Sequence, residues 1–380
     1  MGARTAGDYP RTLAGFYRRF PDDAACFDYL VQTRWPGGFR CPGCGSGDAI
    51  LLKGRRTFAC RACRKHTSVT AGTTLHKSKV PLHAWFQAAW LMTSLAPGIS
   101  ALQLSRQLGL RFASAWLLLH KLRRATVNPE REPLRGDIEM DDAWIGGTQA
   151  GLKGGHQRAG RNALQVIIAV ERRSDTSLGR ARMAVLPNDD AKGVGAFVTA
   201  SITPGATVFS DAHTGYPGAL ADGYTHMPLS QRAMKRDTGK HTSAAPGVDR
   251  VISNLKTWLM GTHHGVGADH LDAYLDEFVF RFNRRHNRAA GFASLLGLTT
   301  EVPPAAASAI SPFSAAAKRR GRSTGQTALV HRNPPPSVGG TPRRRRLVSG
   351  GAIEHRADLD AAPTDGEDRA HDGQVEVRDA

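Results

Sequence analysis

The sequence lacks the features of a membrane or secreted protein. No apolar run approaches the roughly 20 residues that cross a bilayer, and the polar, arginine-containing N-terminus has no hydrophobic signal segment. We therefore expect a cytoplasmic protein with reduced thiols and no membrane partner. Acidic residues are scarce relative to basic ones, since 33 Asp and Glu against 51 Lys and Arg leave a formal net charge of +18. Such a surface favours nucleic acid as the partner, with a general effect on solubility as the alternative.

Cysteine is also scarce, with five in the chain, and four of these form two C-x-x-C pairs. Cys41 and Cys44 make one pair and Cys60 and Cys63 the other, and the segment between the pairs is long enough for a short hairpin. In a reduced protein this pattern predicts a structural zinc ribbon with four thiolate ligands. Redox pairs are the alternative, but no thioredoxin-like βαβ pattern surrounds them. Cys26 is predicted to be a buried small hydrophobe in a helix.

Basic residues surround the cysteine pairs. A phosphate backbone would attract such a group, and ordinary solvated charges are the alternative. The residues are Arg40, Lys53, Arg55, Arg56, Arg61, Arg64, Lys65 and His66.

A helical pattern begins at Pro81. Apolar residues at three- and four-residue spacing predict one helix up to Pro97, and two shorter helices follow, from Ile99 to Gly109 and from Phe112 to Arg124. The last two have the outline of a helix-turn-helix unit. Its second helix would offer polar side chains to DNA, although helical hairpins that only pack are common. The side chains are Arg111, Ser114, Lys121, Arg123 and Arg124.

Carboxylates occur where two predicted strands end. One strand starts at Asp137, and the other, Ala206–Ser210, is followed at once by Asp211. Two acids at strand ends can hold a hard divalent cation between them, while capping of loops is the alternative for any one of them. Strand alternation alone does not choose among the acids of the first strand, which are Asp137, Glu139, Asp141 and Asp142.

The surrounding pattern predicts a mixed sheet flanked by helices. Further strands are predicted at 163–170 and 182–186, and helices at 190–200, 250–259 and 269–285. The Gly-rich, basic segment 146–162 is expected to be a hairpin tip over DNA. After residue 298, Pro-rich and charged stretches predict a disordered tail.

Five motifs occur in one order: IEMDDAWIGG at 138–147, FSDAHTGY at 209–216, VISNLKTWL at 251–259, GTHHG at 261–265 and YLDEFVFRFNRR at 274–285. Together they resemble bacterial insertion-sequence transposases of the ISXO-like family. Members combine an N-terminal zinc ribbon with an RNase H-like core that carries an Asp-Asp-Glu or Asp-Asp-Asn triad. The resemblance spans roughly residues 15 to 298.

The resemblance implies that Asp141, Asp211 and Asn254 are the catalytic triad, with Lys256 as a phosphate contact. These residues would bind Mg²⁺ or Mn²⁺, since two ions can activate the attacking oxygen and stabilise the leaving one. The neutral amide of Asn254 would hold the second ion more weakly than a glutamate.

Three other acids bear on this assignment. Asp142 stands where the family usually has Glu, and Asp249 stands where a His is commonly seen. Glu277 is the rival third ligand on charge alone.

The sequence thus predicts a mixed α/β chain. Its expected parts are a zinc ribbon with an N-terminal helix (1–75), a helix-turn-helix-like DNA-binding region (76–128), an RNase H-like catalytic domain (135–298) and a disordered tail (299–380). The resemblance implies double-stranded DNA as partner, both element terminal inverted repeats and target, bound by a homo-oligomer. A zinc-ribbon transcriptional regulator and a metal-dependent nuclease without strand transfer are the alternatives.

Overall fold

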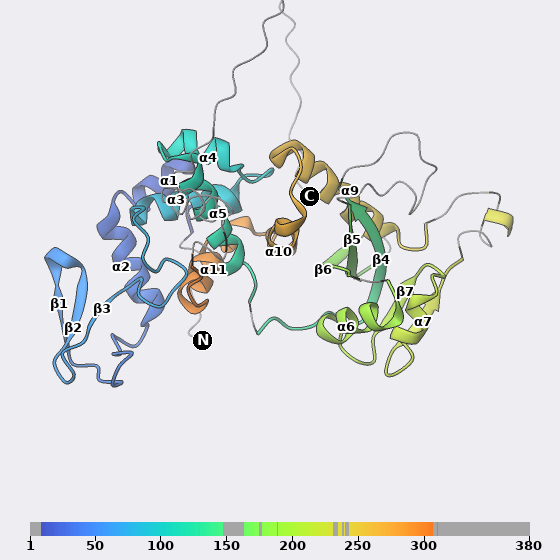
Figure 1. Ribbon diagram of the computed structural model, residues 1–380, viewed down its shortest axis with the longest axis horizontal. Coiled ribbons are helices and arrows are strands. Elements are labelled where there is room, and N and C mark those ends of the chain that lie inside the picture. The colour runs from blue at the N-terminus through green and yellow to red at the C-terminus, as the bar shows by residue number, and fades with distance from the viewer. Residues whose placement is uncertain are drawn as a thin grey trace, which may run out of the picture. The chain divides into compact units, whose positions relative to one another are not determined.

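The computed structural model describes residues 9–128, 130–146, 163–174, 177–187, 189–230, 235–237, 239, 243–306 and 310 (Figure 1). All of them belong to the first of two compact units, which ends at Thr324. The predicted hairpin tip lies outside the described residues from 147 to 162. Most of the predicted tail lies outside them too, but residues 299–306 are described, and the first three continue a helix.

The zinc-ribbon region is a small antiparallel sheet in the order β1-β2-β3. The predicted hairpin is present as β1 and β2, and β3 adds a third strand beside β2. The strands are β1 (Ala49–Leu52), β2 (Thr57–Cys60) and β3 (His66–Ser68).

Helices before and after this ribbon share one hydrophobic core. The helix-turn-helix outline is present as α4, which is capped by the Ser100 side chain and ended by left-handed Gly109, followed by α5. The C-terminal α11, which the sequence did not predict, contributes Phe292, Leu295 and Leu296 to the same core. The helices are α1 (Leu13–Arg19), α2 (Asp23–Arg34), α3 (Leu82–Ser94), α4 (Ala101–Leu108), α5 (Phe112–Ala125) and α11 (Arg288–Glu301).

A five-stranded sheet has the order β6-β5-β4-β7-β8. The first three strands in this order pair antiparallel, whereas β4, β7 and β8 run parallel. The strands are β4 (Asp137–Ile145), β5 (Leu164–Arg172), β6 (Leu178–Val185), β7 (Thr207–Ser210) and β8 (Thr225–Pro228).

Helices cover both faces of this sheet. α6 (Ala191–Ser201) and α7 (Gly215–Ala219) pack on the face that contains Ile138 and Met140 of β4. On the other face, α9 (Pro246–His263) and α10 (Leu271–Asn283), which follows a short 3₁₀ turn at Ala268–His270, pack over Ala143 and Ile145. The predicted mixed α/β fold, with the helix-flanked sheet of an RNase H-like core, is confirmed.

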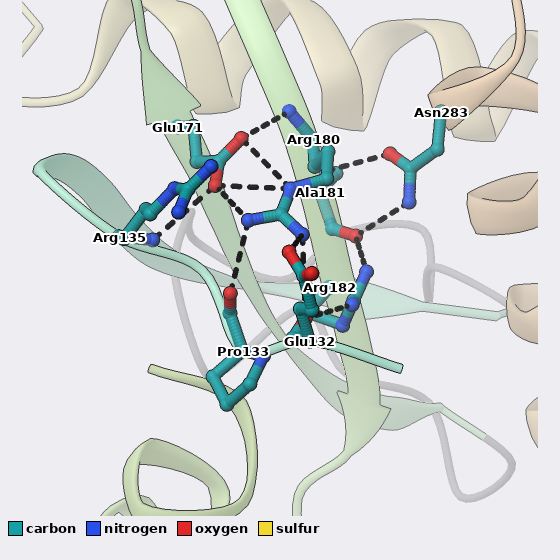
Figure 2. Close-up of polar contacts among 8 residues, drawn as sticks. All are labelled: Glu132, Pro133, Arg135, Glu171, Arg180, Ala181, Arg182 and Asn283. Atoms are coloured by element: carbon teal, nitrogen blue, oxygen red, sulfur yellow. Dashed lines mark hydrogen bonds and ion pairs between the residues drawn. The ribbon is translucent and has the colours of Figure 1, made fainter. Parts of the chain in front are cut away.

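The linker before β4 is fixed to the sheet by charged groups (Figure 2). Glu171 on β5 binds the Arg180 guanidinium of β6 at 2.6 Å and accepts a bond from the Arg135 amide at 3.2 Å. Arg180 in turn donates to the Pro133 carbonyl at 3.0 Å, and Arg182 donates to that of Glu132 at 2.7 Å. These contacts define where β4, with its carboxylates, begins.

Among the helices that the structure describes, none is long and apolar enough to cross a membrane.

Candidate active site

Four cysteine thiols converge beside the small sheet. The Sγ atoms of Cys41 and Cys63 are 3.6 Å apart, as are those of Cys44 and Cys60, and all four lie within 4.8 Å of one another. Tetrahedral zinc with bonds of about 2.3 Å would separate its sulfur ligands by about 3.8 Å. The thiols therefore fit a closed structural zinc site, which stabilises a domain with little core of its own.

Two equivalent backbone turns present these thiols. The Gly45 amide donates to the Cys41 carbonyl at 2.8 Å, and the Arg64 amide donates to the Cys60 carbonyl at 2.9 Å. Both donors have left-handed φ, 74° for Gly45 and 60° for Arg64. The Gly43 amide also donates to the Cys41 sulfur at 3.4 Å, and this bond, with hydrogen bonds from the Cys44 amide and the neighbouring thiols and against the opposing effect of burial, lowers the pKa of the thiol to about 6. A lowered pKa favours the thiolate that zinc requires.

Asp141 and Asp211 occupy matching positions on neighbouring parallel strands. Strands β4 and β7 pair with Glu139 opposite Phe209. Continuing this register by two residues sets Asp141 opposite Asp211, the residue that follows β7. Adjacent strands are about 4.8 Å apart, so the fold brings two carboxylates together that are far apart in the sequence.

Glu139 binds the start of α9 on the face of β4 that also carries Asp141. Its Oε2 accepts hydrogen bonds from the backbone amides of Gly247 at 2.5 Å and Val248 at 3.2 Å. A carboxylate is favoured there because the first amides of a helix have no partner within the helix. Residues two apart on a strand point to one face, so Asp141 also faces α9, whose first turn carries Asp249.

The electrostatics of Asp141 connect it to three other acids. Burial, together with the negative charges of Asp211, Asp142 and Asp249, raises the pKa of Asp141 to about 7, against the opposing effect of the Asp142 amide. That amide donates to Asp141 Oδ1 at 2.8 Å. Coulombic coupling weakens with distance, so Asp211 and Asp249 each lie near Asp141. We call these three residues the acid cluster.

Asp142 faces the other side of β4. Its Oδ1 accepts a hydrogen bond from the Tyr216 hydroxyl at 3.4 Å, and its Oδ2 accepts one from Gln165 Nε2 at 2.8 Å. Asp211 is oriented locally, because its Oδ1 accepts a bond from the His213 amide at 3.1 Å. Because Asp142 is bound on the opposite face of β4, Asp141 is the one of these two neighbouring acids that faces the start of α9.

The carboxylates of the acid cluster are less closely gathered than the thiols of the zinc site. Among the described residues, only the four cysteines form a set of three or more His, Cys, Asp or Glu ligands within 4.8 Å of one another. Three mutually repelling carboxylates separate unless a cation neutralises them, and carboxylate oxygens are the ligands that Mg²⁺ prefers.

The structure sets Asn254 apart from this cluster. A helix turns by about 100° per residue, which rotates Asn254 about 140° from Asp249 around α9. Asn254 lines a cavity of about 340 Å³ with Trp258 and Arg281, and the charged residues that line this cavity are all arginines. Lys256, seven residues after Asp249, lies within about 20° of it around the helix. Lys256 thus shares a side of α9 with Asp249, and Asn254 does not.

Asp249 was not among the ligands predicted from the sequence. The helix was predicted to begin at Arg250, but it begins at Pro246, so Asp249 belongs to its first turn and not to a loop. A usable signal was the seven-residue spacing from Asp249 to Lys256, which puts two charged side chains on one side of a helix.

Two other charged residues are not available for their predicted roles. Glu277 is fully buried, where its carboxylate lies 2.7 Å from Arg123 Nε and 3.7 Å from Arg281 Nη1. This carboxylate is neutralised in the interior and does not rival the acid cluster. Arg123 is only 1% exposed and cannot reach DNA, whereas Arg111 and Arg124 on the same helix are exposed.

Comparisons with known families agree with this architecture. A family model described as an ISXO2-like transposase domain matches residues 133–283, and one described as a transposase zinc-ribbon domain matches residues 21–66. No curated protein matches the chain. The first match covers the five-stranded sheet, α9 and α10, and the second covers the two cysteine pairs, a combination that identifies an enzyme acting on DNA. The chain belongs to the IS1595 family of transposases and carries that family's N-terminal zinc ribbon.

Proposed function

We propose that this transposase cleaves DNA at the ends of an insertion sequence and joins them to target DNA, using Mg²⁺ or Mn²⁺ held by Asp141, Asp211 and Asp249. The observation that carries the proposal is the acid cluster, in which Asp141 of β4 stands in register with Asp211 after β7 and faces α9, whose first turn carries Asp249. The charge of Asp249 acts on Asp141. This supports Asp249 over Asn254 as the third ligand.

Each residue has a role that follows from its position. Asp141 is the acid on which both Asp211 and Asp249 act, and it is suited to bridge two ions. Bound divalent ions would activate the attacking oxygen and stabilise the leaving one. Lys256, further along α9 on the side of Asp249, is suited to contact a phosphate of the bound strand. Binding of the metal requires Asp141 to release its proton.

The reaction has two phosphoryl transfers. Water attacks a phosphodiester at the element end, and the bond to the 3′ oxygen breaks, which leaves a 3′-hydroxyl and a 5′-phosphate. The 3′-hydroxyl then attacks a phosphodiester of the target, where a new bond forms and a target 3′-hydroxyl leaves.

The other regions have supporting roles. We propose that residues 1–75 and 76–128 bind the element ends, that residues 135–298 carry the chemistry, and that a homo-oligomer pairs the two ends. The packing of α11 with the N-terminal helices supports a link between DNA binding and the catalytic region, because α10 and α11 follow each other directly.

The test uses DNA that carries the inverted repeats bracketing the gene, incubated with the protein and Mg²⁺. Asp141→Asn, Asp211→Asn and Asp249→Asn should each keep DNA binding but lose cleavage by more than the roughly 10–100-fold that outer-shell residues cost. Asn254→Ala is the matched control on α9 and should retain cleavage. Loss with Asn254→Ala but not with Asp249→Asn would reverse the assignment.

The same reactions separate the alternatives. A transcriptional regulator would form no cleaved product, and its DNA binding would not respond to the three Asp→Asn changes. A nuclease without strand transfer would cleave the ends but give no joined product. Only a transposase yields both products.

A further inference from the structure

A second candidate site lies in the N-terminal helical region, away from the acid cluster. A cavity of about 550 Å³ is bounded by segment 76–80, α5 and residues 304–306. Its charged and titratable lining residues are His76, Lys77, Lys79 and Lys121, and none of the described residues that line it is acidic. We call it the lysine pocket. A concentration of one charge sign without counter-charges predicts an anionic ligand.

Lys121 is the central feature of the lysine pocket. It is only 8% exposed, and its ammonium group donates one long bond, 3.4 Å, to the His76 carbonyl. A lysine has three N–H donors, so two of them are left for a ligand. Burial lowers the pKa of Lys121, and no acidic residue acts on it to oppose this. A buried cation without a counter-charge is costly, and an anion in the pocket would remove that cost.

The segment opposite Lys121 is rigidly held. His76 accepts a bond from the Gly72 amide at 3.2 Å, and the Ser78 hydroxyl accepts bonds from the Val80 amide at 3.1 Å and from Trp85 Nε1 at 3.0 Å. Within this segment Lys77 adopts a left-handed φ of 52°. Such a conformation is unfavourable for lysine and persists only where the surroundings impose it. The backbone of Lys77 is therefore held in place before a ligand arrives.

The position of the pocket on α5 indicates the ligand. Arg111, Ser114 and Lys121 are three and seven residues apart, which puts them on one side of the helix. Arg123 is on the opposite side, where it binds Glu277. The pocket is thus on the side of the helix-turn-helix unit that carries its available polar groups. Its wall also contains Val80, Trp85, Leu117 and Leu118, against which the apolar edge of a deoxyribose can pack.

We propose that the lysine pocket binds one phosphodiester of the DNA backbone, with Lys121 and Lys77 as the contacts to its non-bridging oxygens. This inference rests on the proposed function insofar as that function requires DNA binding, but it does not require the acid cluster to be catalytic. The contact is to the backbone, so it would contribute to affinity and register and would not read the sequence.

The first test measures binding of the full chain to a labelled duplex across a range of salt concentrations, without Mg²⁺. Lys121→Met keeps the alkyl stem, and it should weaken binding and lower the salt slope by about 0.9, the value for one lost phosphate contact. Lys121→Arg should restore most of the slope. Lys192→Met, which removes an exposed lysine on α6, is the control for general charge and should change the slope much less. An unchanged slope with Lys121→Met overturns the proposal.

Lys77→Gln tests the proposal even if Lys121→Met misfolds, because the Lys77 side chain is exposed and its loss should not unfold the protein. It should also weaken binding, but because both lysines contact the same phosphate, combining it with Lys121→Met should lower the slope no further than Lys121→Met alone. Tighter DNA binding by the Lys121 variant would instead mean that an acidic segment of the chain occupies the pocket and competes with DNA, and this too overturns the proposal.

A methylphosphonate scan of the duplex identifies the contact directly. Neutralising one particular phosphate should weaken binding to the unaltered protein but not to Lys121→Met, whereas it should still weaken binding to Asp141→Asn. If each methylphosphonate weakens DNA binding by all three proteins equally, the pocket does not hold a phosphate. A protein that binds no DNA at all would instead refute the proposed function.

Discussion

The carboxylate of Glu139 on β4 accepts a hydrogen bond of 2.5 Å from the backbone amide of Gly247 in α9. The approach leaves no room for a side chain at residue 247, since an added Cβ would lie 2.7 Å from Glu139 Oε2 and 2.6 Å from Leu178 Cδ2. This contact fixes the start of α9 over the strand that carries Asp141. The position of Asp249, two residues later, therefore depends on a glycine that is required for space and not for a positive φ.

Gly247→Ala should destabilise the protein by about 1–3 kcal/mol, the range for a forced fit in a packed site. It should reduce cleavage more than DNA binding, because it displaces Asp249 while leaving the zinc ribbon intact. Thermal denaturation and the cleavage assay measure the two effects. Gly261→Ala is the matched control in the same helix, where nothing lies within 4 Å of the added Cβ, and it should be neutral or stabilising. Equal effects of both changes would refute the argument from space.

The raised pKa of Asp141 predicts a pH-dependent stability. This carboxyl titrates at about 7 in the folded protein, against an ordinary value of 3.8. Between these values the folded state holds a proton that the unfolded state has lost, so the stabilisation present at low pH is lost as the pH rises through about 7. Without Mg²⁺, Asp141→Asn should therefore melt at a higher temperature than the unaltered protein at pH 8, and the difference should shrink towards pH 4.

Added Mg²⁺ should narrow the difference in melting temperature between Asp141→Asn and the unaltered protein at pH 8, because the ion stabilises only the protein whose acid cluster is intact. Cleavage at limiting Mg²⁺ should increase with pH through about 7 for the same reason. If the melting difference is the same at both pH values, Asp141 does not titrate as its surroundings indicate.

Direct metal binding by Asp211 can be tested with a thiol. Asp211→Cys should be inactive with Mg²⁺, which prefers oxygen ligands, and should regain part of its cleavage with the softer Mn²⁺. Asp211→Ala is the control and should stay inactive with both ions. Recovery of the alanine variant with Mn²⁺ would show that the side chain of Asp211 does not contact the metal.

Much of this arrangement can be predicted from local sequence. The cysteine pairs predict the zinc ribbon because both pairs and the hairpin between them are contained in one short segment. Strands β4, β5 and β7 follow from apolar runs and alternation, and Asp211 from its place directly after a strand. These features depend on neighbours along the chain, so they need no knowledge of the tertiary structure.

The proposed third ligand could not be predicted in the same way. Choosing between Asp249 and Asn254 requires the first residue of α9 and the direction in which each side chain points, and both are decided by tertiary contacts from Glu139 on a distant strand. The helix α11 was missed because it is apolar on most sides, with buried residues from Gly291 to Thr299. A helix of that kind gives no amphipathic pattern.

Loss of the zinc site should leave the rest of the fold intact. Cys60→Ser should abolish the bound zinc and unfold the ribbon, because the metal supplies most of the stability of a domain with so little core. The sheet around β4 should remain folded, since its two cores contain no ribbon residue. Zinc content and DNA affinity are the measurements. Cys26→Ala, which changes a buried cysteine outside the zinc site, is the control and should retain full zinc.

The pair formed by Arg123 and Glu277 predicts an asymmetric response to mutation. The two side chains are 1% and 0% exposed and 2.7 Å apart, and Arg281 lies 3.7 Å from the same carboxylate. Removing one member of a buried pair leaves an uncompensated charge and costs about 3–5 kcal/mol. Glu277→Gln leaves two arginines without a counter-charge, whereas Arg123→Met leaves Glu277 with Arg281.

Denaturant unfolding should therefore show a larger loss of stability for Glu277→Gln than for Arg123→Met. The double variant should lose less than the sum of the two, because the second change removes a charge that the first left unpaired. Arg124→Met, an exposed neighbour on α5, should stay within about 0.5 kcal/mol of the unaltered protein. Additive losses would mean that the two side chains do not interact, and that the contact between α5 and α10 depends on apolar packing alone.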